Sequence, residues 1–126
     1  MNLNKVMLIG YLTREPELRS LPSGLQVCSF SMATNQSYLK DGKRMNEATF
    51  HEVVAFGKTG ELVAEYLQKG SQLYVEGRLR NRSWEKDGQK YRRTEIMADR
   101  VQFGAKREEP EPEDQSREEM YADVPF

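Results

Sequence analysis

The sequence predicts an all-β domain with one short helix. Apolar and polar residues alternate with a period of two in several short segments, which is typical of strands with one buried face. Turn signals that contain glycine, such as Pro22-Ser23-Gly24 and Asp87-Gly88, separate these segments. One stretch alone has the spacing of an amphipathic helix. These three observations favour a small barrel or sandwich of strands.

The alternation is clearest between Gln72 and Trp84. Its odd positions are apolar or small and suit a buried face: Leu73, Val75, Gly77 and Leu79. Its even positions point the other way: Tyr74, Glu76, Arg78, Arg80, Arg82 and Trp84. A row of arginines that leads to an exposed tryptophan suits a phosphodiester chain and the flat face of a base. The other interpretation is a solvated strand face whose Trp84 folds back onto the core.

Four further segments complete the expected sheet. The five predicted strands are 6–9, 27–35, 48–56, 72–84 and 91–103, with a polar connection after the first. The second carries Cys28, Phe30 and Met32 on one face. A polar hairpin loop around Asp41-Gly42 should project from the sheet before the third strand. Both faces of the third strand are largely apolar, so we expect it to be covered by core, ligand or another subunit.

The helix is expected between the third and fourth strands. Thr59 is its predicted N-cap, Gln68 its end and Gly70 the residue that stops it. Its apolar stripe comprises Leu62, Val63, Tyr66 and Leu67 and is typical of a helix that plugs a barrel. Five strands with a helix in this position are the order of the OB-fold, a small Greek-key barrel that binds single-stranded nucleic acids. From pattern alone, another small barrel or a sandwich stays open.

The charges are segregated along the chain. Residues 1–106 carry 17 Lys or Arg against 12 Asp or Glu, a balance of +5, whereas residues 107–126 carry 2 against 8, a balance of −6. A basic body with an acidic tail predicts a polyanionic partner and a separate interaction segment. The tail is rich in Glu and Pro without an apolar period, so we expect it to be disordered.

The composition argues against several other classes of protein. The single Cys28 cannot form an internal disulfide, which fits a reducing cytoplasm. His51 is the only histidine, so neither a metal site nor a catalytic pair is expected, and no cofactor is implied. The first ten residues contain only about five consecutive apolar residues, too few for a signal peptide or a membrane span.

Several segments resemble the bacterial single-stranded DNA-binding protein family. They are residues 4–10 (NKVMLIG), 50–58 (FHEVVAFGK), 65–80 (EYLQKGSQLYVEGRLR) and the terminal 122–126 (ADVPF). The resemblance implies an OB-fold domain over residues 1–106 that assembles as a homotetramer and coats single-stranded DNA without sequence preference. It also implies a cytoplasmic, nucleoid-associated protein of DNA replication, recombination and repair that is not an enzyme.

The resemblance also assigns residues to the binding site. The four positions at which the family stacks bases fall on Tyr38, Phe50, Phe56 and Trp84. The family usually has tryptophan at the first two, so this chain has smaller rings there. Among the basic residues we expect Arg78, Arg80 and Arg82 to contact phosphates, because their shared parity places them on one face.

Two residues are expected at a subunit interface. The family resemblance assigns His51 and Tyr74 to contacts between subunits and not to catalysis. An interface would also explain the two apolar faces of the third strand.

The C-terminal residues 122–126 are expected to form a tip that docks replication, recombination and repair proteins. Pro125 stiffens the peptide, Phe126 provides an anchor, and Asp123 with the α-carboxylate offers charges to a basic pocket; Val124 is the fourth residue assigned to the tip. The alternative is a tail that only improves solubility. This tip has one aspartate where the family usually has two, and the tail before it is short.

Three other functions are compatible with the pattern. One is an RNA-binding or phage-encoded relative with the same fold, which competition with RNA and genomic context would distinguish. Another is a pure interaction protein, in which the aromatics pack subunits and the tail acts alone. The last is an enzyme, although the sequence contains no recognisable set of catalytic residues.

The charge segregation makes a first testable prediction about the tail. If the acidic segment competes with DNA for the basic body, deletion of residues 107–126 should tighten binding of oligo-dT at low salt. The affinity of full-length and truncated chains can be compared by titration at low and high salt. Unchanged or weaker binding after truncation would refute the competition.

Overall fold

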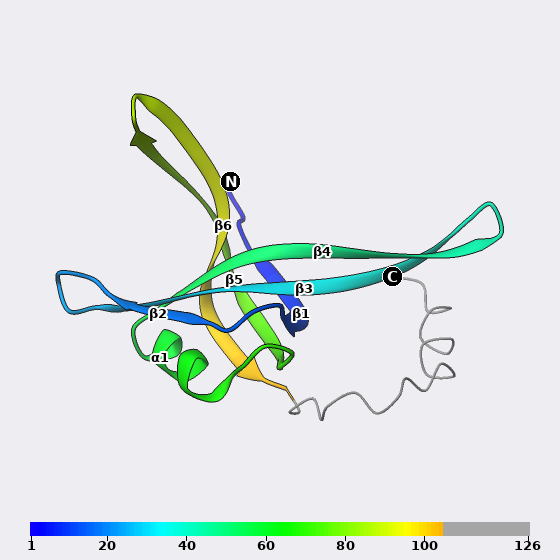
Figure 1. Ribbon diagram of the computed structural model, residues 1–126, viewed down its shortest axis with the longest axis horizontal. Helices are drawn as coiled ribbons and strands as arrows, with labels where there is room; N and C mark the ends of the chain where they lie inside the picture. Colours follow the sequence, from blue (N-terminus) through cyan, green and yellow to red (C-terminus); the bar gives the residue numbers. More distant parts are fainter. Residues whose placement is uncertain (105–126) are drawn as a thin grey trace.

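The computed structural model describes residues 1–104 as a closed five-stranded β-barrel with one helix (Figure 1). The sheet has six strands, of which β2 lies outside the barrel ring. They are β1 (Val6–Leu12), β2 (Glu17–Ser20), β3 (Gln26–Lys40), β4 (Lys43–Phe56), β5 (Gln72–Lys86) and β6 (Gln89–Phe103). β1 pairs with β5 and also with β3, which closes the ring β1-β5-β6-β4-β3. The predicted OB-fold barrel is therefore confirmed.

The short strand β2 is a departure from the prediction. It pairs with β3 alone and lies at the edge of the sheet, where the sequence indicates only a polar connection. All four of its residues are exposed, so no alternation of apolar and polar side chains marks it as a strand. Its backbone pairing with β3, from Glu17 opposite Ser29 to Ser20 opposite Gln26, is what makes it one.

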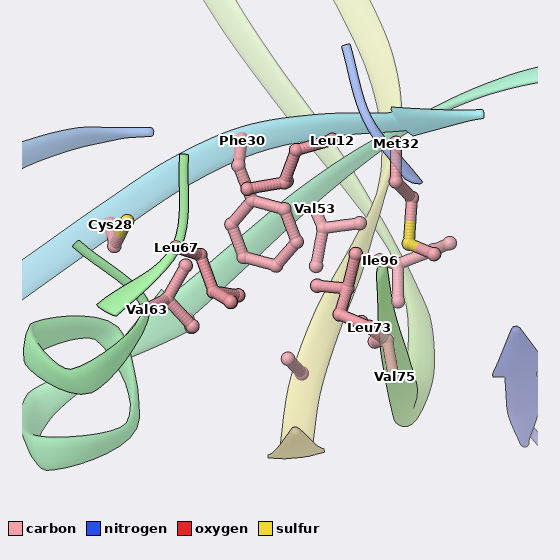
Figure 2. Packing of buried hydrophobic residues seen from close by; sticks show 12 residues of the cluster. Leu12, Cys28, Phe30, Met32, Val53, Val63, Leu67, Leu73, Val75 and Ile96 are labelled. Carbon is pink, nitrogen blue, oxygen red and sulfur yellow. The ribbon is translucent and has the colours of Figure 1, made fainter. Parts of the chain in front are cut away.

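The core lies inside the barrel and takes residues from all five barrel strands. Phe30 is fully buried between Val63 and Leu67 on one side and strand residues such as Val53 on the other (Figure 2). Cys28, Phe30 and Met32 are all 0% exposed, which confirms the predicted face of this strand. Burial raises the pKa of the Cys28 thiol to about 11, because the thiolate would lose its hydration.

The helix α1 (Gly57–Tyr66) differs from its prediction at both ends. It begins directly after Phe56, without a side-chain cap, so Thr59 lies inside the helix and is not its N-cap. It ends at Tyr66, and the backbone N–H of Leu67 donates to the carbonyl of Val63. Val63 and Leu67 still enter the core, as the apolar stripe predicts. No helix within residues 1–104 is long and apolar enough to cross a membrane.

Two glycines allow the backbone to approach where the barrel changes course. A Cβ on Gly10 would lie 2.2 Å from the carbonyl oxygen of Ala33, at the point where β1 turns from β5 to β3. A Cβ on Gly77 would lie 2.1 Å from the carbonyl oxygen of Met97, beside the irregularity in the β5–β6 register. Both positions therefore need glycine for steric reasons.

Two hairpins continue past the barrel as two-stranded arms. We call residues 34–49 of β3 and β4 the β3–β4 arm, and residues 78–95 of β5 and β6 the β5–β6 arm; they leave the barrel in different directions (Figure 1). Each closes in a two-residue turn with positive φ at both positions, 53° and 74° at Asp41-Gly42 and 54° and 78° at Asp87-Gly88. These are the predicted tight hairpin turns.

The start of the β5–β6 arm corrects one prediction. Leu79 has the parity of the buried face, but its side chain is 49% exposed. The last pair between β1 and β5 is Val6 with Gly77, so no core lies under the arm beyond it. The Asn4 side chain replaces β1 there, because its amide donates to the Leu79 carbonyl at 2.8 Å and its oxygen accepts from the Leu79 N–H at 2.9 Å.

The close approach at Gly77 predicts a large effect of a small substitution. Gly77→Ala should lower the free energy of unfolding by about 1–3 kcal/mol, because the new methyl group must push β5 away from Met97. Urea denaturation measures this change. Ser83→Ala on the exposed arm is the matched control and should stay within about 0.5 kcal/mol of the unmodified chain. Equal stability of the two variants would contradict the steric argument.

Candidate nucleic-acid interface

A row of rings and guanidinium groups runs from the barrel onto the β5–β6 arm. We call it the aromatic–arginine row; it consists of Phe50 and Phe56 on β4 and Arg78, Arg80, Arg82 and Trp84 on β5. The Arg80 Cζ lies 5.9 Å from the centroid of the Phe56 ring, and the Arg82 Cζ lies 5.0 Å from the Trp84 ring. Contacts of this kind hold the guanidinium near the ring face and leave its outer N–H groups available.

Strand parity explains how the local sequence builds this row. The β5–β6 register is regular from Gly77 to Lys86, so every second residue of β5 points to the same side. The β3–β4 register is also unbroken, and it places Phe50 and Phe56 on one face of β4, as their spacing predicts. The structure thus brings the three predicted arginines onto one face with Trp84, and Arg80 against Phe56.

The arginines of the row also have partners within the sheet. The Arg80 guanidinium Nη2 lies 3.6 Å from a carboxylate oxygen of Glu95, its cross-strand neighbour on β6. The Arg78 guanidinium donates to the Met97 sulfur at 3.3 Å. Both contacts restrict the side chains before any ligand arrives, which lowers the entropic cost of a later contact.

A further aromatic residue, which the sequence analysis does not name, belongs to this surface. Tyr91 on β6 stacks on Trp84, with ring centroids 5.7 Å apart and an interplanar angle of 18°. Sequence reasoning missed it, although a signal was present: a two-residue turn at Asp87-Gly88 makes Trp84 and Tyr91 direct cross-strand partners. The stacked pair keeps both rings partly open, at 38% and 40% exposure.

The strands β3 and β4 present their exposed aromatic residues on two faces. Phe50 is 67% exposed on β4. Tyr38 lies on β3 opposite Met45, whereas Phe50 lies opposite Ala33. The odd spacing between Ala33 and Tyr38 places Tyr38 on the other face of the β3–β4 hairpin. The structure therefore does not bring Tyr38 and Phe50 together.

The electrostatics of the β5–β6 arm favour an anion. Residues 78–95 contain seven Lys or Arg and three Asp or Glu. Arg82 and Arg93 are direct cross-strand partners on one side of the arm. Within residues 1–104, no carboxylate forms an ion pair with either of them. Like charges at this spacing repel each other, so a bound phosphate would relieve the repulsion.

The two predicted interface residues lie on different surfaces. His51 on β4 shares the parity of the core residues and forms a 2.9 Å hydrogen bond between its Nε2 and the Thr34 hydroxyl. Tyr74 on β5 lies opposite Ile9 on the outside of the barrel, and its hydroxyl donates to Glu76 at 3.2 Å. Their role at an interface stays a prediction.

The surface around Tyr74 combines apolar and charged groups. Met7 and Ile9 on β1 are each 64% exposed. Beside them, the Lys5 ammonium lies 2.7 Å from a Glu76 carboxylate oxygen. The hydrogen bond with Lys5 lowers the pKa of the Glu76 carboxyl, and that with Glu76 raises the pKa of the Lys5 ammonium. Exposed large apolar side chains next to an ion pair are typical of a surface that contacts another protein.

The predicted C-terminal tip is not among the residues that the structure describes. Asp123, Val124, Pro125 and Phe126 lie outside the described residues, as does the whole acidic tail, residues 107–126. In the described part, no group of three or more His, Cys, Asp or Glu side chains is placed to hold a metal ion.

The fold and the aromatic–arginine row define an OB-fold domain with a basic, aromatic surface. Comparison with known proteins identifies the family of OB-fold proteins to which it belongs. Residues 3–104 match the Single-strand binding protein family, and the chain belongs to that family.

Named relatives agree with this assignment. The chain is 44% identical over 108 residues to single-stranded DNA-binding protein 1 of Chlorobaculum tepidum, an alignment that covers 82% of this chain and 67% of the relative. It is 48% identical over 103 residues to single-stranded DNA-binding protein 2 of Staphylococcus aureus, covering 80% and 72% of the two chains.

Two solved structures share the fold. The Plasmodium falciparum SSB in complex with ssDNA superposes with a TM-score of 0.74 at 33% identity, over 82% of this chain and 96% of that one. A deletion variant of the single-stranded DNA binding protein from Thermus aquaticus gives a TM-score of 0.71 at 34% identity. That alignment covers 80% of this chain and half (50%) of the Thermus chain.

The environment of His51 predicts a pH-dependent stability. Burial lowers the pKa of His51 below its ordinary value of 6.5, so the unfolded chain binds a proton more readily than the folded chain. Stability from this residue is therefore present above pH 6.5 and is lost as the pH falls below it. Chemical denaturation from pH 8 to pH ~5.5 should show a smaller loss for His51→Gln than for the unmodified chain. An equal loss of stability in the two chains over this pH range would contradict the role of His51.

Proposed function

We propose that this chain binds single-stranded DNA without sequence specificity. Bases stack on Tyr38, Phe50, Phe56 and Trp84, and phosphates bind to Arg78, Arg80 and Arg82. The observation that carries the proposal is the aromatic–arginine row, in which Arg80 lies against Phe56 and Arg82 against Trp84. The relatives' names and the Plasmodium complex with ssDNA support the same ligand.

The physical chemistry of the row suits a single strand of any sequence. Every base has a π-face, and stacking on a protein aromatic contributes about 1–3 kcal/mol per base whatever the base is. Guanidinium groups contact phosphates, which are the same at each nucleotide. A duplex hides its base faces, so the exposed rings favour unpaired DNA.

The two arms support a wrapped path for the strand. Tyr38 and Phe50 lie on different faces of the β3–β4 hairpin, and Trp84 lies on the β5–β6 arm. A strand that contacts all of them passes around the β3–β4 arm and then reaches the β5–β6 arm. Tyr91, stacked on Trp84, extends the aromatic surface at the far end of this path.

Assembly is part of the proposal. The chain would form a homotetramer through surfaces that include Tyr74 and His51. The exposed Met7 and Ile9 beside Tyr74 support such a contact, since their burial would remove apolar surface from water. Assembly would multiply the arms available to one strand of DNA.

The same proposal assigns the protein a place among DNA transactions. It would act without catalysis and without a cofactor, in the cytoplasm and on the nucleoid, during replication, recombination and repair. Its tip, residues 122–126, would recruit the proteins of these processes, and the acidic composition of residues 107–126 supports a basic docking site on those partners.

The test is a salt-dependent titration with oligo-dT. Binding should quench Trp84 fluorescence, and affinity should fall with salt at a slope of about 0.7 per phosphate contact. Anisotropy of a labelled oligonucleotide then compares variants. Arg82→Ala should weaken binding and reduce the slope by about 0.7, whereas Lys58→Ala on α1 should change neither.

The same titration separates the alternatives. Tighter binding of oligo-U than of oligo-dT would favour an RNA-binding relative. No quenching and no binding at low salt would leave the tail as the functional part and overturn the proposal. Light scattering of the free protein measures the mass, and a monomer mass would contradict the homotetramer.

A further inference from the structure

A buried carboxylate lies inside the aromatic–arginine row. Glu95 on β6 is 5% exposed and is the one charged residue that is buried within residues 1–104. It lies directly opposite Arg80, and one of its oxygens is 3.6 Å from the Arg80 guanidinium. It therefore occupies the base of the β5–β6 arm, on the side where the arginines point.

This position is unfavourable for a carboxylate in two respects. Burial removes the water that hydrates the negative charge, so the group needs a paired cation. In addition, a negative charge on a face that binds a polyanion repels the ligand. A residue with both disadvantages would be better replaced by a neutral one, unless its contact with Arg80 contributes to the site.

The contacts of Arg80 indicate what that contribution is. Its side chain crosses β6, which lies between β5 and β4 in the sheet, and its guanidinium reaches the Phe56 ring. Glu95 and Phe56 both lie beside this planar group, yet the Arg80 side chain remains 42% exposed. The N–H groups that do not face Glu95 stay available to a ligand.

We propose that Glu95 is a positioning residue that holds Arg80 across β6, against the ring of Phe56, in the orientation that binds a phosphate of single-stranded DNA. This inference rests on the proposed function of the row. Glu95 does not contact the DNA; it acts through Arg80. Because the guanidinium is already fixed, its contact with a phosphate costs less side-chain entropy, and the Phe56 ring stays beside the guanidinium.

The direction in which one substitution changes the affinity for DNA tests the proposal. Glu95→Gln removes a negative charge with almost no change in shape, so electrostatics alone predicts tighter binding of DNA. Positioning predicts the opposite: an affinity for oligo-dT lower by about three- to tenfold, with a salt slope smaller by up to about 0.7. Glu85→Gln is the matched control, since Glu85 is exposed on the other side of the same arm, opposite Lys90. It should leave binding unchanged or slightly tighter.

A double-mutant cycle shows whether Glu95 acts through Arg80. In an Arg80→Ala background, Glu95→Gln should no longer weaken binding, because the group that it positions is gone. Equal weakening in both backgrounds would mean that Glu95 supports the arm as a whole, and would overturn the proposal. Thermal melting of each variant reports whether the fold is intact.

Arg80→Lys provides an independent measurement if Glu95→Gln unfolds the chain. Lysine keeps the positive charge but cannot pair with a carboxylate and lie flat on a ring at once. Positioning predicts that Arg80→Lys loses most of the affinity that Arg80→Ala loses. Binding equal to that of the unmodified chain would overturn the proposal.

The outcomes also separate this inference from the proposed function. If the unmodified chain does not bind oligo-dT even at low salt, both fail. If it binds, and Glu95→Gln tightens that binding as simple charge removal predicts, the positioning role alone is overturned.

Discussion

The close contact between Gly77 and the carbonyl of Met97 is the constraint on which the rest of this structure depends. Up to Gly77, β5 belongs to the barrel and buries Leu73 and Val75; beyond it, β5 leaves the core as one strand of an arm. One strand thus supplies both core residues and the arginines of the candidate interface. The stability of the barrel fixes the origin of the arm and, through the regular register, the direction of each arginine.

The interface that results combines two interactions that differ in range and specificity. The attraction between a guanidinium charge and a polyanion extends over about a Debye length and is weakened by salt. Ring stacking acts only at contact and is not weakened by salt in this way. The structure joins the two at Arg80 with Phe56 and at Arg82 with Trp84. Each pair can meet a phosphate and its neighbouring base together, which suits a ligand whose charge and rings alternate along the chain.

Much of this arrangement could be predicted from local pattern. The turns Asp41-Gly42 and Asp87-Gly88 predict two hairpins, and the alternation in residues 72–84 predicts that the arginines share a side with Trp84. Thr59 failed as an N-cap because the chain can enter a helix directly from a buried strand, without a side-chain cap. The strand β2 was missed because backbone pairing alone, and no buried face, defines it.

By itself, the sequence determined which residues lie on the same side of each strand and where the strands turn, because period and turn chemistry are local properties of the backbone. Only the tertiary structure decided what covers each side. Leu79 has the parity of a core residue but is exposed, since β1 ends its pairing at Gly77. Glu95 looks like an ordinary strand residue, yet it is buried against Arg80, and Arg80 reaches Phe56 over an intervening strand. The burial of Glu95 and the contact between Arg80 and Phe56 depend on the pairing of β6 with β4, which brings distant segments together and which no local pattern encodes.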